Sequence, residues 1–470
     1  FKSEHSGPIV AIIFVRVFFI TLNYQSLNSY LMIAILNNIK IYLLFFIFFI
    51  GCGNTPKGNW KDQRVILISI DGFRGSLLKE KLFAKKCPNL LELINKGRSC
   101  SQVVSVFPSL TYPAHTSMIT GVPPEIHGIT NNRIFDPSKN FVDWFWYADS
   151  IKTPTLITKA KEKNLVSLGV SWPVTVGAAI DYLLPEFKSV NDSISTVDLI
   201  RKHDNPKYFL EIAKTRGIFP ENKNPEGFSR DLLLHQLFID TFIRKKPNLS
   251  LYHMIETDLI QHKYGKNSEE AWKAFMFMDS LIGNIMSLLD RNNLWETTTL
   301  VIIGDHGFKN HSYEISINRL FESKGWLKIK NDEIYNWEVV AIPSGGSAFV
   351  HLKDSENEQF KQKVRIALSR MNEFEVLEER HVKGSSLSLH KSNFILLAKK
   401  DYTFTRSVDQ PLIKQRFGGS HGGDPEDKEL YTGFIAVGPS ISNEVVSKMA
   451  ITDVAKIISP ILGLNLDFNH

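Results

Sequence analysis

The stretch Val65-Ile66-Leu67-Ile68-Ser69-Ile70-Asp71-Gly72 decides the fold of this chain. The residues before Asp71 are apolar except for one serine, which is typical of a short strand buried on both faces of a parallel sheet. Asp71 and Gly72 then end the apolar run. Because ligands bind outside the carboxyl ends of the strands in such sheets, Asp71 lies where a site is expected.

The rest of the chain repeats this rhythm of strand and helix. Helices are predicted at residues 87–97, 153–163, 232–244 and 269–290, and strands at 101–107, 166–170, 251–255 and 298–303. The alternation predicts an α/β fold, with a mainly parallel central sheet and helices on both faces. Two stretches interrupt it, at about 185–230 and at 308–405, and the second has an α+β pattern. We interpret both as insertions into one domain of residues 63–470.

The first 53 residues have the pattern of an export signal. Lys40 precedes the apolar run 41–50, which leads into Gly51-Cys52-Gly53. A cation, a short apolar run and small residues form a secretory signal, and a cysteine at this place is typical of a bacterial lipobox. Residues 54–62 are polar and form a linker. We expect an exported lipoprotein, periplasmic or at the cell surface and anchored to a membrane. A transmembrane anchor is the alternative, but ten apolar residues are too few to span a bilayer.

Composition narrows the class of protein. The 470 residues are 43% hydrophobic and 22% charged, as in a globular protein. The net charge of +6 is mild and no long basic block is present, which disfavours stable nucleic-acid binding. No feature indicates a specific protein partner. Cys87 and Cys100 bracket a predicted helix about 15 Å long. That length is too great for a disulfide, so both thiols are expected to be free and buried.

Residues of the types that bind zinc recur at the ends of the apolar runs. Besides Asp71 they are Asp258, His262, Asp305, His306 and His421. The four-residue spacing of Asp258 and His262 places both side chains on one face of a helix or tight turn. His421 lies among four glycines, in a loop that we expect to be neither helix nor strand. Each motif is weak alone, but Asp and neutral His are natural zinc ligands, and their joint occurrence predicts a metal site.

The order of these segments resembles the nucleotide pyrophosphatase/phosphodiesterase family of the alkaline phosphatase superfamily. The likeness runs from about residue 64 to 439. It is most specific in Phe107-Pro-Ser-Leu-Thr-Tyr-Pro-Ala-His-Thr-Ser-Met-Ile-Thr-Gly121, followed by Pro124-Glu-Ile-His-Gly-Ile-Thr-Asn-Asn132. It implies an alkaline-phosphatase-like fold, Thr111 as the nucleophile, and Asn132 as the residue that binds a non-bridging phosphate oxygen. The family treats His115 and His127 as structural.

The resemblance also implies two zinc ions per chain. One is assigned to Asp258, His262 and His421, and the other to Asp71, Asp305 and His306 with Thr111 bridging to it. Zinc lowers the pKa of a threonine hydroxyl, so Thr111 is expected to attack phosphorus in line and form a phospho-threonine intermediate. Asn132 and the backbone N–H of Tyr112 are expected to stabilise the equatorial oxygens.

Two neighbours of the expected ligands depart from the family pattern. Thr257 replaces the proline that usually precedes the aspartate of the first zinc site, and Gly304 replaces the serine that usually precedes the Asp-His pair. We expect both metals to be retained and their environment to be changed.

The segments around Thr111 and Trp172 indicate the reaction. No arginine stands two residues after Pro113, which disfavours a sulfatase, and residues 169–177 lack the Lys-x-Arg pair of the related phosphomonoesterases. Trp172-Pro173 is typical of the diesterases. Tyr112 and Trp172 are therefore expected to stack on a leaving group or base, with core packing of Trp172 as an open alternative.

The predicted function is zinc-dependent hydrolysis of phosphodiester or pyrophosphate bonds in small molecules or nucleotides. The alternatives are a phosphonoacetate hydrolase, a phosphomonoesterase of the same superfamily, and an inactive zinc-binding surface lipoprotein.

Overall fold

The computed structural model describes residues 60–136, 141–186, 202, 207–215, 227–377, 384–385 and 387–468. The predicted signal region 1–53 with Cys52, most of the linker 54–62 and much of the interruption at 185–230 lie outside these residues. Within the described ranges, no helix combines the length and apolar character needed to cross a membrane. Asn59–His470 form one unit.

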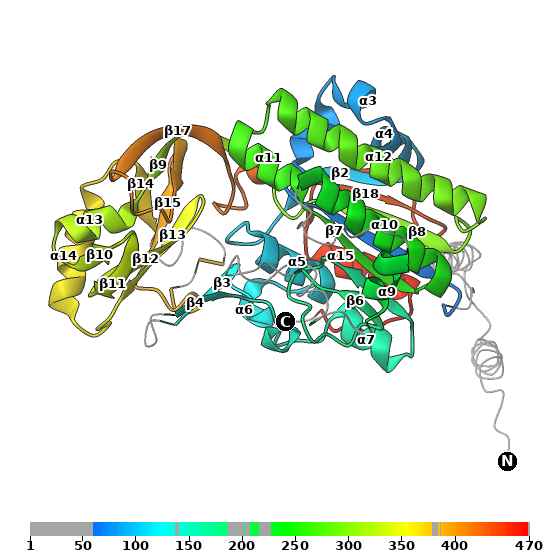
Figure 1. The fold of residues 1–470 in the computed structure, drawn as a ribbon, viewed down its shortest axis with the longest axis horizontal. Helices are drawn as coiled ribbons and strands as arrows, with labels where there is room; N and C mark the ends of the chain where they lie inside the picture. Colours follow the sequence, from blue (N-terminus) through cyan, green and yellow to red (C-terminus); the bar gives the residue numbers. More distant parts are fainter. Residues whose placement is uncertain are drawn as a thin grey trace, which may run out of the picture. The chain divides into compact units, whose positions relative to one another are not determined.

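A mainly parallel sheet lies at the centre of this unit (Figure 1). Its strand order is β19-β2-β18-β8-β1-β7-β5-β6, and β20 also pairs with β2. β1 (Arg64–Ile70) is parallel to both of its neighbours, whereas β18 (Thr432–Val437) is antiparallel to both of its own. The other strands are β2 (Arg98–Val104), β5 (Ser167–Val170), β6 (Tyr182–Leu184), β7 (Leu249–Met254), β8 (Thr298–Ile303), β19 (Val445–Val446) and β20 (Met449–Ala450). The predicted fold class is confirmed.

The alternation of side chains along β1 explains why helices cover both faces of the sheet. Ile66, Ile68 and Ile70 pack into one hydrophobic core, while Val65 and Leu67 pack into the other. Full burial of each such side chain contributes about 1.5–3 kcal/mol. The first face is covered by α3 (Phe83–Lys86), α4 (Pro88–Lys96), α9 (Tyr208–Thr215), α10 (Gly227–Lys245) and α12 (Glu269–Arg291). The second is covered by α5 (Thr111–Thr120), α7 (Leu156–Glu162) and α15 (Asp453–Ile461).

The predicted helices and strands are present with small shifts at their ends. The helix expected at 87–97 is α4, which begins at Pro88. Cys87 and Cys100 are free and buried, as predicted. The strand expected at 101–107 is β2, which begins earlier because Ser99 and Cys100 already pair with β18.

The region predicted as α+β at 308–405 has that architecture. An antiparallel sheet of order β12-β13-β15-β14 packs with two helices around a hydrophobic core of its own. These elements are β12 (Val339–Ser344), β13 (Ser347–Leu352), β14 (Phe374–Leu377), β15 (Phe394–Ala398), α13 (Ile317–Ser323) and α14 (Glu358–Ser369). A second sheet of order β16-β9-β17 joins this region to the rest of the unit, through β9 (Lys309–Ile315), β16 (Asp401–Phe404) and β17 (Ile413–Ser420).

The remaining elements are short. They are the 3-10 helices η1 (Gly75–Lys79), η2 (Ala148–Ser150) and η3 (Lys428–Leu430), the helices α6 (Pro124–His127) and α11 (Glu256–Tyr264), and the hairpins β3 (Arg133–Asp136) with β4 (Phe141–Trp144) and β10 (Leu327–Lys330) with β11 (Glu333–Trp337). Of these, α11 and the segment before β3 carry residues of the site described below.

Candidate active site

Three neighbouring parallel strands end at the same edge of the sheet. Asp71 directly follows β1, Asp305 is the second residue after β8, and β7 leads into α11, which carries Asp258 and His262. The predicted one-face arrangement on α11 is present, since Asp258 Oδ1 lies 3.3 Å from His262 Nε2. The topology thus gathers at one place four residues that the sequence separates by up to 234 positions.

Asp258, His262 and His421 form the first cluster. Asp258 Oδ1 is 3.4 Å from His421 Nε2, and the Nε2 atoms of the two histidines are 3.2 Å apart. Each Nδ1 instead faces a backbone carbonyl, at 2.8 Å from Gly419 for His262 and at 3.0 Å from Ser109 for His421. Because a carbonyl only accepts hydrogen bonds, each Nδ1 carries the hydrogen, and each Nε2 has the lone pair that a metal ion requires.

The glycine-rich segment before His421 is a strand, so the prediction of a loop is wrong for Gly418-Gly419-Ser420. These residues belong to β17 and pair with β9. The reason for the glycines is the close approach of β17 to α11. A Cβ atom on Gly418 would lie 2.6 Å from the carbonyl of His262, and one on Gly419 would lie 2.5 Å from the carbonyl of Gln261.

Asp71, Asp305 and His306 form the second cluster. His306 Nε2 lies 3.4 Å from Asp71 Oδ1 and 3.2 Å from Asp305 Oδ2, while its Nδ1 is 3.2 Å from the carbonyl of Gly307. Asp305 Oδ1 accepts the N–H groups of Gly72 and His306, at 2.9 and 3.0 Å. The ring of His306 stacks on that of His421 with centroids 3.5 Å apart, so the two clusters adjoin.

These clusters have the properties of metal sites. Four buried atoms in them have no hydrogen-bond partner, namely Asp71 Oδ1, Asp258 Oδ1, Asp305 Oδ2 and His306 Nε2. A buried polar atom without a partner is costly, and cations bound at the two clusters would give each of these atoms a partner.

Two carboxylates respond differently to this crowding. Burial, with the nearby carboxylates of Asp305 and Asp258, raises the pKa of Asp71 well above its usual value. Burial also opposes the ionisation of Asp258, but His262 and His421 outweigh it and hold the pKa of Asp258 well below its usual value. Neighbouring carboxylates whose pKa values are shifted in opposite directions are typical of a functional site.

Thr111 is the first residue of α5, and residues on either side of it in the chain contact the two clusters. His421 Nδ1 donates to the carbonyl of Ser109, two residues earlier, and His115 Nδ1, one turn later, lies 3.8 Å from Asp305 Oδ2. Thr111 is 8% exposed, so the residue is buried but still in contact with solvent.

Asn132 reaches the same helix end. The N–H of Tyr112 donates to Asn132 Oδ1 at 2.8 Å, which leaves Asn132 Nδ2 as the donor for a ligand. Tyr112 N–H was expected to bind a phosphate oxygen directly, but here it orients the amide of Asn132.

Comparison with known proteins identifies the family of the chain. The sequence from 65 to 424 matches the family model of type I phosphodiesterase / nucleotide pyrophosphatase. The chain belongs to this family.

Individual relatives of this phosphodiesterase family are distant. Bis(5'-adenosyl)-triphosphatase ENPP4 of Homo sapiens is 27% identical over 54% of this chain and 49% of its own length, and venom phosphodiesterase 2 of Crotalus adamanteus is 25% identical over 84% and 45%. The chain thus spans about half the length of these curated relatives. A solved structure of murine ectonucleotide pyrophosphatase / phosphodiesterase 5, an inactive threonine-to-alanine variant in complex with AMP, has a TM-score of 0.63 at 20% identity. That match covers 86% of this chain and 96% of the other and shows the shared fold.

The two aromatic residues predicted to contact the substrate are buried in this family member. Tyr112 is 1% exposed and packs against Trp144 and Trp146, with ring centroids at 5.3 and 6.2 Å. Trp172 is 0% exposed and lies edge-on to His115 at 4.8 Å. Neither ring offers a free face to a ligand, so core packing, the alternative left open for Trp172, describes both better than stacking.

His115 and His127 are fully buried, in agreement with a structural role. His115 Nδ1 donates to the carbonyl of Thr111 at 2.8 Å, and burial lowers the pKa of each histidine to about 3. Both rings are therefore neutral near pH 7.

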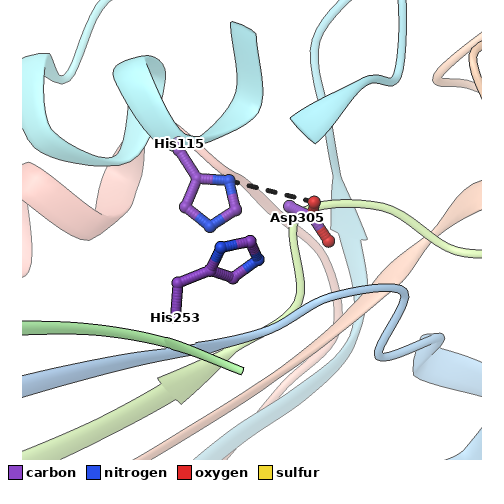
Figure 2. Close-up of side chains that lie close together, drawn as sticks. All are labelled: His115, His253 and Asp305. Carbon is purple, nitrogen blue, oxygen red and sulfur yellow. Dashed lines mark ion pairs between the residues drawn. The ribbon is translucent and has the colours of Figure 1, made fainter. Parts of the chain in front are cut away.

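One residue of the site, His253, was missed by the sequence analysis. It lies in β7, fully buried, and together with His115 and Asp305 it forms a third cluster beside the two already described (Figure 2). The signal that could have revealed it is an ionisable residue inside a fully buried strand. Such a residue requires a polar partner.

Proposed function

We propose that this protein is a two-zinc phosphodiesterase or nucleotide pyrophosphatase that cleaves phosphodiester or pyrophosphate bonds through a phospho-threonine intermediate at Thr111. The observation that carries the proposal is the convergence of two adjoining Asp/His clusters at the first turn of α5, where Thr111 lies. The family supports the reaction class, and the names of the human and rattlesnake relatives, a bis(5'-adenosyl)-triphosphatase and a phosphodiesterase, support small nucleotide substrates.

Following the resemblance, we assign Asp258, His262 and His421 to one ion, and Asp71, Asp305 and His306 to the other. The contacts of His306 with both aspartates support the second assignment. Asp258 also lies close to Asp71 and His306, so the two sites adjoin. When bound, the ions lower the pKa of a coordinated hydroxyl and offset the negative charge on the phosphate oxygens.

The residues of the chain supply the nucleophile and its geometry. Thr111 Oγ attacks phosphorus, forming an Oγ–P bond as the bond to the leaving oxygen breaks, and water then cleaves the Oγ–P bond in a second step. Asn132 Nδ2 donates to a non-bridging oxygen whose negative charge grows in the transition state. Tyr112 N–H holds the amide of Asn132 for that contact.

The segment 169–177 favours a diester over a monoester. It contains no Lys or Arg, and the side chains of Trp172, Val174 and Val176 within it are buried and apolar. A phosphomonoester dianion would therefore lack a pair of cations to bind its second negative charge. A diester has one negative charge fewer, and its second ester group can pack against apolar side chains.

The decisive experiment compares Thr111→Ala with the wild type. We expect the variant to retain its metal content and circular dichroism spectrum and to lose turnover of bis-p-nitrophenyl phosphate by at least about a thousandfold, because the group that bonds to phosphorus is gone. Thr120→Ala, which removes a hydroxyl bonded to the carbonyl of Thr116 on the same helix, is the matched control.

Several results would overturn the proposal. They are substantial residual turnover by Thr111→Ala, less than one metal ion per wild-type chain, and faster cleavage of p-nitrophenyl phosphate or phosphonoacetate than of diesters. Two bound metal ions without any turnover would instead indicate the inactive zinc-binding alternative.

We further propose that the protein is exported and anchored to a membrane by lipid at Cys52. The support is the cation, apolar run and small residues of 40–53. Cys52→Ser should release the protein from the membrane fraction, and unchanged retention would favour a transmembrane anchor.

A further inference from the structure

His253, in strand β7, is buried beside the second cluster. His253 Nε2 lies 3.2 Å from Asp71 Oδ2, on one side of the ring. On the other side, His253 Nδ1 lies 3.2 Å from the carbonyl of Ser171 and 3.6 Å from Glu186 Oε2. The ring itself is 0% exposed, so these oxygens, and not water, are its polar partners.

Both nitrogens of His253 face hydrogen-bond acceptors. A carbonyl and a carboxylate both accept hydrogen bonds, so a hydrogen on either ring nitrogen has an oxygen to face.

The two carboxylate oxygens of Asp71 are used on opposite sides. Oδ2 faces His253, while Oδ1 faces His306 Nε2 at 3.4 Å and has no hydrogen-bond partner. The backbone carbonyl of Asp71 accepts the hydroxyl of Thr257 at 2.6 Å. The hydrogen bond from Thr257 fixes the main chain at Asp71. His253 Nε2 lies within ion-pair distance of Oδ2 and makes no other hydrogen bond, so it is available to hold that side of the carboxylate.

The ring of His253 is itself held in place. His115 lies against it with centroids 4.3 Å apart, and Figure 2 shows the two imidazoles side by side next to Asp305. Since His115 Nδ1 is bonded to the carbonyl of Thr111, the packing connects His253 to the helix that carries the nucleophile.

We propose that His253, supported by Glu186, is a positioning residue that holds Asp71 Oδ2 and so aims Asp71 Oδ1 at the second metal site. The inference rests on the proposed function, because it takes Asp71, Asp305 and His306 as metal ligands. A histidine bonded to a ligating carboxylate restricts that ligand before the ion arrives, and loss of such a partner lowers metal affinity by roughly 10–100-fold.

The test measures zinc affinity in chelator-buffered solutions, with the bound ions counted by elemental analysis. His253→Phe keeps a planar ring and removes both ring nitrogens. We expect it to weaken the binding of one of the two ions by roughly 10–100-fold and to leave the other unchanged. His253→Gln, which keeps a side-chain N–H donor, should recover part of the loss. Glu186→Gln should weaken the binding of the same ion by a smaller factor. This variant also tests the inference if His253→Phe fails to fold.

His127→Phe is the matched control, because His127 is equally buried and contacts Ser117 and Ile129, away from the ligands. It should leave the affinity for both ions unchanged.

Three outcomes would overturn the inference. They are unchanged affinity in His253→Phe and Glu186→Gln, an equal loss of both ions, and three ions bound per wild-type chain, which would make His115, His253 and Asp305 a metal site in their own right. The assay does not use turnover. A protein that binds two ions in a His253-dependent way but cleaves no diester would contradict the proposed function alone.

Discussion

At the scale of single residues, the site contains three histidines whose tautomer is set by hydrogen bonds to backbone carbonyls. His262, His306 and His421 each direct Nδ1 to a carbonyl, of Gly419, Gly307 and Ser109 respectively. Each ring is therefore fixed in the tautomer with its lone pair on Nε2, before any ion is bound. His253 differs in the oxygen that it faces, since its Nε2 lies at Asp71 Oδ2, whereas His306 Nε2 lies at Asp71 Oδ1.

Asn132 gives a prediction at this scale. Its Nδ2 is assigned to a phosphate oxygen that gains charge in the transition state, so Asn132→Ala should lower kcat for a diester by roughly 10²–10³-fold. KM should change much less, since the bond strengthens only as the charge develops.

Steady-state kinetics with bis-p-nitrophenyl phosphate would measure both constants. The outcome that would contradict the assignment is a rise in KM with kcat unchanged, because it would place the contact in the ground state. Asn131→Ala is a suitable control, since the Asn131 side chain donates to Ser344 and not to the helix end.

At the scale of elements, the packing of β8 against β18 explains why position 304 is a glycine. A Cβ atom on Gly304 would collide with Thr432 Oγ1 and would lie 2.6 Å from the carbonyl of Phe73. The Thr432 hydroxyl occupies that space and donates to the same carbonyl at 2.7 Å. The space beside Gly304 is thus filled by a hydroxyl from the neighbouring strand.

Gly304→Ser should therefore destabilise the protein by about 1–3 kcal/mol, as expected when atoms are added to a packed interior. The free energy of unfolding in urea would measure the loss. Adding Thr432→Ala should recover part of it, so that the double variant loses less than the sum of the two single variants. If the two losses of stability are strictly additive, the Thr432 hydroxyl does not occupy the space that a serine side chain at position 304 requires.

At the scale of the whole molecule, the metal ligands come from both the central sheet and the segment next to the inserted region. Asp258 and His262 lie on α11, whereas His421 follows β17, whose partner β9 begins the inserted region. Bound metal would therefore tie these parts together, and a ligand that binds only the folded state stabilises it.

Removal of the metal by a chelator should loosen this connection first. We expect faster amide hydrogen exchange in α11 and β17 and little change in β1 and β8, whose residues lie in the buried sheet. The melting temperature should also fall, and added zinc should restore both properties. Uniform exchange across the sheet after chelation would show that the ions do not act at this junction.

The sequence alone determined the alternation of strands and helices, the parallel sheet and the acidic residues at the strand ends. The reason is that the periodicity of apolar residues and the residues that end an element are local properties of the chain. It also supplied the candidate ligands, through the order of the Asp and His motifs along the chain. Only the tertiary structure decided that Gly418-Gly419-Ser420 form a strand against α11, that Tyr112 and Trp172 are buried, and that His253 lies between Asp71 and Glu186. These facts depend on contacts between segments far apart in the chain, and no local pattern records which side chains such contacts bring together.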